Sequence, residues 1–280
     1  MKFNSDKFQA IRFALLFSET MYHDDSGAEI EQLLVVKDLG IHISQDLLFD
    51  QHIRTIANKG KRMTGWILRT FNTRRCDIML TLLKQLIYPT VEYNSVLWNP
   101  SDQSLIDLME SVQNNFLKRI HSPTLKADSD YWDRLEHFML YSLQRRRERY
   151  MIMYTWKVVH EIYPNPGLHL NHTTEDHSVH PNHGVAINIT NSNEILVQHG
   201  PSHPGWLEGK SVLHACCELY NSMPRALKMT LQPEVEPCFI NFKKQVDEWL
   251  VKIPDRPTSA RRPRIAKSNS ILHMKDYIKR

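Results

Sequence analysis

The 280-residue sequence has few cysteines and no long apolar run. Its four cysteines, Cys76, Cys216, Cys217 and Cys238, are unevenly spaced, and no signal peptide pattern accompanies them. This argues against a disulfide framework and for reduced thiols. The longest uninterrupted apolar run near the start, Phe13 to Phe17, is far shorter than the roughly 20 residues of a membrane span. We therefore expect an intracellular protein of the nucleus or cytoplasm, without a membrane partner.

The sequence also lacks the common signatures of catalytic and metal sites. No glycine-rich phosphate loop and no Ser/His/Asp grouping stands out. A polar segment from 164 to 204 is rich in histidine, but no sulfur or second ligand pair has the spacing of a zinc site. Its clustered histidines are His169, His172, His177, His180 and His183. Cys216 and Cys217 are adjacent rather than two apart, which also speaks against a zinc site. We therefore expect no metal and no cofactor in this chain, and we interpret residues 164–204 as a His-rich linker.

The apolar content, 41% with a mean hydropathy of −0.44, is low for a globular protein, which favours helical modules joined by polar segments. Residues 8–17 and 33–43 are rich in Phe, Ile, Leu and Val, and they predict two strands around a long hairpin, the only β region that we expect. From Phe49 on, the apolar spacing becomes helical. The sequence thus predicts a mainly α fold with a short β-hairpin at its start.

Three helical patterns follow the hairpin and can close into a bundle. The first has apolar residues at three- or four-residue steps from Ile53 to Ile67, and the second covers about 76–88. Pro89 disfavours continuation of the second. The third runs from Leu105 to Ile120, with Ser101 or Asp102 as its N-cap. A further helical pattern covers 131–160, and a final helix is predicted over 239–251, before a Pro- and Arg-rich tail from 254.

Charge is balanced overall but clustered locally. The 35 basic and 31 acidic residues give a net charge of +4. Residues 54–75, however, contain seven basic residues and no acid: Arg54, Lys59, Lys61, Arg62, Arg69, Arg74 and Arg75. Such a run suits neutralisation of nucleic-acid phosphates, and a solvated helix face is the alternative. Among these cations we expect Trp66 and Phe71 to pack into the bundle rather than stack on bases. For the run Arg145 to Arg149, a salt-bridged outer face and an RNA contact both remain open.

Several stretches, in order along the chain, resemble the reverse transcriptases of jockey-like non-LTR retrotransposons. The stretches are MKFNSDKFQAIRF (1–13), VKDLGIHIS (36–44), HIRTIANKGKRMTGWILRTF (52–71), YPTVEYNSVLWNP (88–100), WDRLEHFMLYSLQRRRERYMIMYTWKV (132–158), LYNSMPRALK (219–228), FKKQVDEWLVKIPDRP (242–257) and SNSI (268–271). No single motif is diagnostic, but this many collinear matches are hard to obtain by chance, and they cover nearly the whole chain.

The resemblance implies a division of the chain into parts of a right-hand polymerase. Residues 1–45 would be the end of the palm, with Leu39 and Gly40 in the primer-grip strand. Residues 46–125 would form a thumb-like helical bundle. Beyond it we expect a helical extension at 126–163, the linker at 164–204, and a tail with one or two helices at 205–280. Lys7, three residues after Asn4, matches a position that the family links to protonating the departing pyrophosphate.

The resemblance also implies that the family's Mg²⁺-binding Tyr-x-Asp-Asp hairpin lies upstream of Asn4 and Lys7. Residues Tyr22 to Asp25 have the same letters, but they follow Lys7 and precede the primer-grip strand. Adjacent carboxylates in one loop cannot by themselves hold two metal ions about 3.5–4 Å apart. With Ser26 and Gly27 they are typical of a turn. We therefore expect a turn here, no catalytic residue in this chain, and no polymerisation by the chain alone.

The favoured interpretation is the C-terminal part of a retrotransposon RNA-directed DNA polymerase that holds an RNA or DNA duplex by its phosphate backbone. Its contact residues would be Lys59, Lys61, Arg62 and Arg69, and a separate fingers–palm half would be a possible partner. The alternatives are a transposon remnant without function and an independent nucleic-acid-binding or scaffold module. Duplex binding with a steep salt dependence separates the remnant from the other two.

Overall fold

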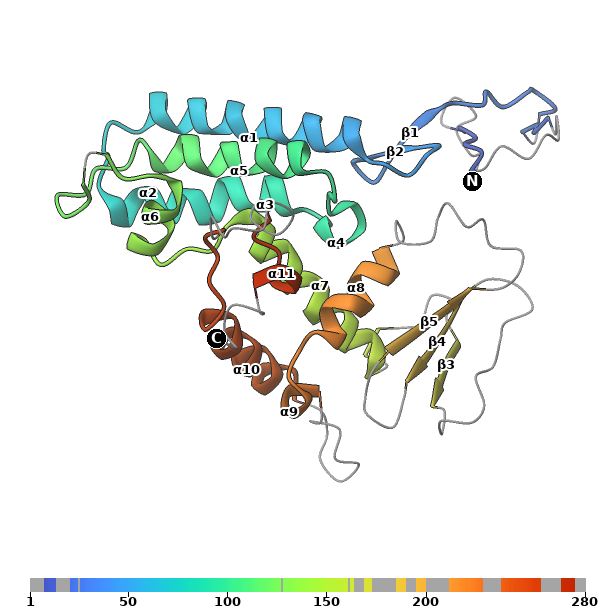
Figure 1. The fold of residues 1–280 in the computed structure, drawn as a ribbon. Helices are drawn as coiled ribbons and strands as arrows, with labels where there is room; N and C mark the ends of the chain where they lie inside the picture. Colours follow the sequence, from blue (N-terminus) through green and yellow to red (C-terminus); the bar gives the residue numbers. More distant parts are fainter. Residues whose placement is uncertain are drawn as a thin grey trace. The chain divides into compact units, whose positions relative to one another are not determined.

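The structure is a computed structural model, and it describes residues 8–13, 21–24, 26–126, 128–160, 162–163, 169–172, 185–189, 195–199, 212–228, 238–257 and 268–274. Across these ranges the fold is mainly helical with a short antiparallel hairpin (Figure 1), which confirms the predicted fold class at that level. None of the described helices combines the length and the apolar character that a membrane span requires.

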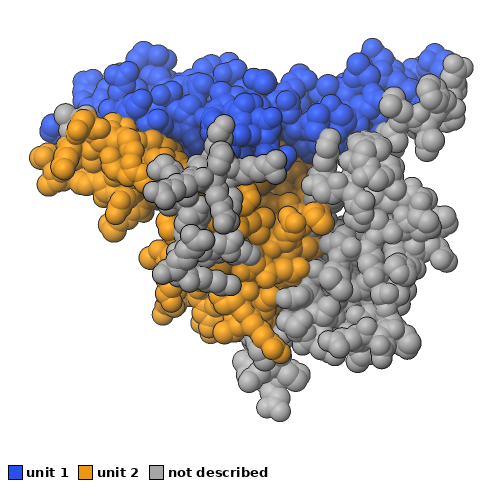
Figure 2. All heavy atoms as spheres, viewed as in Figure 1, with its two compact units in different colours: residues 1–93, 100–121 blue, residues 94–99, 122–280 orange. Residues whose placement is uncertain are grey.

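The chain divides into two compact units, coloured separately in Figure 2. The first unit comprises residues 1–93 and 100–121, and the second comprises residues 94–99 and 122–280. The sequence therefore leaves the first unit at Tyr93, contributes six residues to the second unit, and returns at Pro100.

The first unit contains a tight hairpin made of β1 (Val35–Asp38) and β2 (Ile41–Ser44). Asp38 pairs with Ile41, which leaves Leu39 and Gly40 as a two-residue turn. Their φ angles are 46° and 89°, as a type I′ turn requires at both central positions. The prediction of one continuous strand over 33–43 is therefore wrong, because the apolar run folds back on itself at a pair that is not a usual turn sequence. In the other predicted strand, 8–17, the described residues 8–13 contain one bridge, from Ala10 to Gln32.

Three helical segments form the core of the first unit. Helix α1 (Asp50–Thr70) packs against α5 (Gln103–Leu117), which lies beside it in Figure 1, and against α3 (Tyr88–Glu92). The side chains buried in these elements and in the helical segment before α3 belong to the predicted apolar faces: Ile53, Ile56, Ile67, Leu83, Ile87, Leu105, Met109, Val112 and Phe116. Asp102 is the N-cap of α5, and its carboxylate accepts bonds from the amides of Ser104 and Leu105, so the predicted cap is confirmed.

The predicted end of the second helix at Pro89 is wrong. Helix α2 (Cys76–Leu82) continues into a π-helical segment, Leu83–Ile87, and then into α3, where Pro89 occupies the first turn. A π-helical turn widens the backbone locally. Proline has no amide hydrogen to donate, and its ring crowds the preceding turn of a helix. Helical structure therefore continues past Pro89 to Glu92.

The second unit is built around α7 (Leu143–Val159), which packs against α8 (Val212–Asn221) and against α4 (Ser95–Trp98). Its other helices are α6 (Tyr131–His137), α9 (Arg225–Lys228), α10 (Phe239–Val251) and α11 (Ile271–Met274). Helix α10 has the predicted bounds, and it buries Phe242, Val246 and Leu250 against the cluster around Trp156. The expected helical stretch over 131–160 is interrupted between His137 and Leu143.

A second sheet lies in the segment that was expected to be a linker without regular structure. Strand β4 (Val185–Ile189) pairs in parallel with β3 (His169–His172) and antiparallel with β5 (Ile195–His199). The expectation that the N-terminal hairpin is the only β region is therefore wrong. The strands are only four or five residues long, and such short stretches within a polar segment carry little periodicity to detect.

Candidate nucleic-acid interface

Helix α1 presents a row of cations on the side opposite its core face. Arg54, Lys61, Arg62 and Arg69 are all exposed and recur at seven- or eight-residue steps, which places them along one side of the helix. We name these four residues the cationic stripe. The residues that α1 buries, including Ile53, Gly60 and Ile67, recur on the other side. With a rise of about 1.5 Å per residue, the stripe extends over roughly 22 Å.

Of the four predicted contact residues, Lys61, Arg62 and Arg69 belong to the stripe, and Lys59 lies beside it. All four are exposed, and none forms an ion pair with another described residue. Lys59 lies near His52, whose pKa is lowered to about 4, mainly by burial and further by the charges of His42 and Lys59. Arg54 lies near Asp102, and its charge contributes to lowering the pKa of that carboxyl, after the hydrogen bonds from Ser104 and Leu105.

Two other cations of the run have structural partners. The Arg74 guanidinium donates to the carbonyl oxygens of Leu68 and Thr73, at 2.8 and 2.9 Å, and to that of Phe71. It thereby satisfies carbonyl groups at the C-terminal end of α1. Arg75 forms an ion pair of 2.9 Å with Asp77. The available positive charge of the segment is therefore concentrated on α1 itself.

Trp66 lies next to the stripe and is 48% exposed. It follows Arg62 by four residues and precedes Arg69 by three, so its side chain neighbours both on the helix surface. Its ring meets Phe71 edge to face, with ring centroids 6.2 Å apart. The prediction that Trp66 packs into the bundle is therefore wrong. Phe71, for which the same was predicted, is partly buried.

The residues assigned by resemblance to the palm lie apart from this helix in sequence. Leu39 and Gly40 form the tip of the β1–β2 hairpin, where the Leu39 side chain is 82% exposed. Strand β2 contacts α1, and the His42 amide donates to Nδ1 of the buried His52 at 3.3 Å. Lys7, like Asn4, lies outside the described residues.

The loop with the letters Tyr-His-Asp-Asp is a turn, as predicted. One carboxylate oxygen of Asp24 accepts hydrogen bonds from the Ser26 amide (2.9 Å), the Ser26 hydroxyl (2.6 Å) and the Ala28 amide (2.9 Å). Gly27 adopts a φ of 81°. The hydrogen bond from the Ser26 side chain is the main reason that the pKa of Asp24 is lowered. Asp24 thus organises its own loop, and Asp25 lies outside the described residues.

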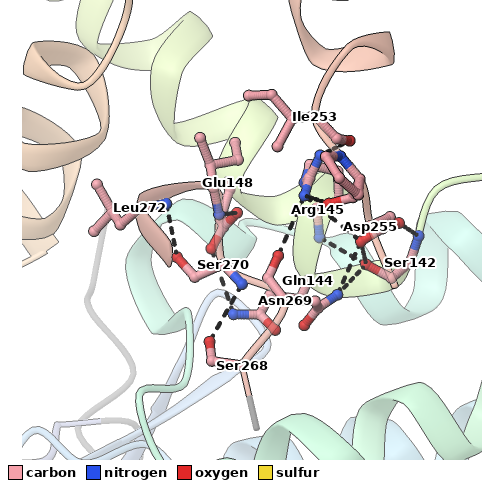
Figure 3. Close-up of polar contacts among 12 residues, drawn as sticks. Ser142, Gln144, Arg145, Glu148, Ile253, Asp255, Ser268, Asn269, Ser270 and Leu272 are labelled. Atoms are coloured by element: carbon pink, nitrogen blue, oxygen red, sulfur yellow. Dashed lines mark hydrogen bonds and ion pairs between the residues drawn. The ribbon is translucent and has the colours of Figure 1, made fainter. Parts of the chain in front are cut away.

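Two arginines of the Arg145–Arg149 run lie in the interior of the second unit rather than on its surface. Arg145 and Arg147 are fully buried. The Arg145 guanidinium donates to the carbonyl oxygens of Ile253 (3.1 Å), Pro254 (2.9 Å) and Asn269 (3.3 Å). Figure 3 shows Arg145 pointing toward Ile253 and Asn269. Both interpretations left open by the sequence are therefore wrong for these two arginines, because both are buried, and Arg145 holds distant backbone segments together.

The same cluster continues on either side of Arg145 (Figure 3). Ser142, the N-cap of α7, donates its amide (2.6 Å) and its hydroxyl (2.8 Å) to the two carboxylate oxygens of Asp255, and Asn269 donates to both residues. Glu148 accepts from the Ile271 amide at 2.8 Å, and burial raises the pKa of this carboxyl. We name this set of contacts the polar cluster; it fixes the segments 253–255 and 268–271 to α7.

Arg147 and Arg149 are also engaged within the second unit. Arg149 pairs with Asp247 of α10, with 2.8 Å between Nη2 and Oδ2. The Nε of Arg147 donates to the side-chain oxygen of Asn99 at 3.0 Å. Nothing in the sequence showed that the Arg run meets the polar stretches IPDRP (253–257) and SNSI (268–271).

In the part of the chain that the structure describes, no group of three or more His, Cys, Asp or Glu side chains is placed to hold a metal ion. The structure describes His169 and His172 only as part of β3, and His177, His180 and His183 lie outside the described residues. All four cysteines are free, and burial raises the pKa of Cys216 and of Cys217 to about 12.

The uncharacterized protein B0403.1 of Caenorhabditis elegans is 26% identical to this chain over 112 residues, which cover 40% of this chain and 57% of that protein. The match thus spans little more than half the length of the relative. No family model matches the chain, and no solved structure matches it.

Proposed function

We propose that this chain is the C-terminal part of a non-LTR retrotransposon reverse transcriptase, in which α1 holds nucleic acid by its phosphates. The observation that carries the proposal is the cationic stripe, together with Lys59, on the exposed side of a helix whose other side is firmly packed. A rigid helix presents charges at fixed spacing, and cations that form no ion pair with a described acidic side chain, as with Lys59, Lys61, Arg62 and Arg69, are free to replace the counterions of a nucleic-acid backbone.

Backbone contacts of this kind position nucleic acid without reading its sequence. We therefore expect weak binding that is similar for all sequences, with dissociation constants on the order of 10⁻⁴ to 10⁻⁶ M at physiological salt. In this proposal the carboxylates that bind Mg²⁺ belong to the rest of the polymerase, so the chain alone extends no primer. An independent nucleic-acid-binding module would use the same stripe and would differ only in having no polymerase partner.

The test measures binding of a labelled duplex by fluorescence anisotropy across a salt series. Replacing Lys61 and Arg62 together by Ala should weaken binding to every sequence alike and flatten the log–log salt slope by up to about two units, one for each lost contact. Both side chains are exposed, so the fold should not change.

The matched control replaces Lys243 and Lys244 by Ala, an adjacent exposed pair on α10 in the second unit. The control variant should keep the wild-type slope. Equal losses in both variants would indicate diffuse attraction to a positive surface, and an unchanged Lys61/Arg62 variant would remove α1 as the contact.

A further inference from the structure

Trp66 gives the stripe a feature that phosphate binding alone does not require. Within α1 it is the one large apolar side chain counted among the exposed residues. Its neighbours on the helix surface are Arg62 and Arg69, and Lys59 lies two turns before it on the same side. A flat aromatic ring between cations combines the two groups that bind unpaired nucleotides, namely a stacking surface for the base and positive charge for the phosphates.

The ring is also held in place. Phe71, just beyond the end of α1, contacts it edge to face at an interplanar angle of 82°, and such aromatic pairs are favourable beyond the area they bury. Phe71 thus supports the ring of Trp66 while nearly half of the side chain stays exposed. A surface residue whose orientation is fixed before binding loses less conformational entropy when a ligand stacks on it.

Continuous duplex offers no free base face to such a ring, because its bases are stacked on one another. An unpaired base at the end of a duplex does. We propose that Trp66 stacks on an unpaired base, so that α1 binds a duplex with a single-stranded overhang more tightly than a blunt duplex. This inference rests on the proposed function and narrows the ligand class to junctions between paired and unpaired nucleic acid.

The test uses the full chain and three labelled probes: a blunt duplex, the same duplex with a short oligothymidine overhang, and the same duplex with an abasic overhang of equal length. The abasic overhang adds the same phosphates without bases, so it separates stacking from charge. Stacking of one base should make the oligothymidine probe bind about 5- to 150-fold more tightly than the abasic probe, equivalent to about 1–3 kcal/mol.

Trp66→Ala should remove this difference without changing affinity for the blunt duplex, and Trp66→Phe should restore part of it. A thermal melt of each variant shows whether the fold is intact. If both overhangs bind alike in the wild type, or if the difference survives in Trp66→Ala, the inference is wrong while the phosphate grip stands. If the wild type binds none of the probes, the proposed function fails as well.

Discussion

Two glycines of α1 differ in what surrounds them. A Cβ atom added at Gly60 would lie 2.8 Å from a methyl carbon of Val91 and 2.8 Å from one of Val112, closer than such atoms can approach. At Gly65, on the exposed side, the nearest atom would be the end of the Arg69 side chain at 3.3 Å, which can move away. Gly60 therefore allows α1 to pack closely against α3 and α5, and Gly65 has no such role.

This difference predicts opposite effects of the same substitution. Gly60→Ala should lower the free energy of unfolding by about 1–3 kcal/mol, because overpacking outweighs the gain in helix propensity. Gly65→Ala should raise it by up to about 1 kcal/mol, since alanine favours the helix and displaces only a flexible side chain. Urea unfolding followed by circular dichroism measures both. Equal stability of the two variants would contradict the close packing at Gly60.

At the scale of helices and strands, the sequence allowed good predictions where a regular apolar repeat faces one core. Helix α10 was predicted with its observed bounds, and the apolar face of α1 from Ile53 to Ile67 was recognised. Predictions failed where the usual conformational preference of a residue was overridden by the surrounding backbone. The π-helical segment accommodates Pro89, and a positive φ at Leu39 turns an apolar run into a hairpin. Neither feature leaves a pattern in composition or period.

The candidate site was predictable only in part for a related reason. Exposed cations without nearby acids, such as Lys61 and Arg62, follow from the helical repeat. The burial of Arg145 does not, because its partners are backbone carbonyls 108 or more residues away in the chain. Charge in a sequence indicates exposure only where no distant segment covers it. Long-range pairing of this kind cannot be deduced from a single sequence.

Removal of the Arg145 guanidinium is expected to release the segments that it holds. Arg145→Met would leave the carbonyl groups of Ile253, Pro254 and Asn269 without this donor and Asp255 without its buried positive neighbour. Removing one member of a buried charged network typically costs about 3–5 kcal/mol. Hydrogen exchange measured by mass spectrometry should therefore show faster exchange in Ile271–Met274 than in the wild type.

The control for Arg145 is Lys252→Ala, which removes an exposed cation directly before the segment 253–255. It should leave exchange in Ile271–Met274 unchanged. Arg145→Lys is informative as well, because a single ammonium group cannot reproduce the spread of the guanidinium donors and should restore little of the protection. Wild-type exchange in Arg145→Met would mean that the polar cluster does not hold these segments.

On the scale of the whole molecule, the two units are not consecutive along the chain. Helix α4 belongs to the second unit, although residues of the first unit precede and follow it. It contacts α7 and α8, Val96 packs against the core around Trp156, and Trp98 is buried. The second unit is therefore incomplete without six residues that the sequence places between α3 and α5.

This arrangement predicts that a substitution in α4 acts on the second unit. Trp98→Ala removes a fully buried ring, and truncations of this kind cost about 3–5 kcal/mol because they leave a cavity. Hydrogen exchange should accelerate in α7, α8 and α10, while α1 and α5 keep their protection. The matched control is Trp66→Ala, which removes the half-exposed tryptophan of α1 and should leave the second unit unaffected. Equal acceleration in α1 and α5 after Trp98→Ala would show that the two units unfold together. Residues 94–99 would then stabilise the cores of both units rather than that of the second unit alone.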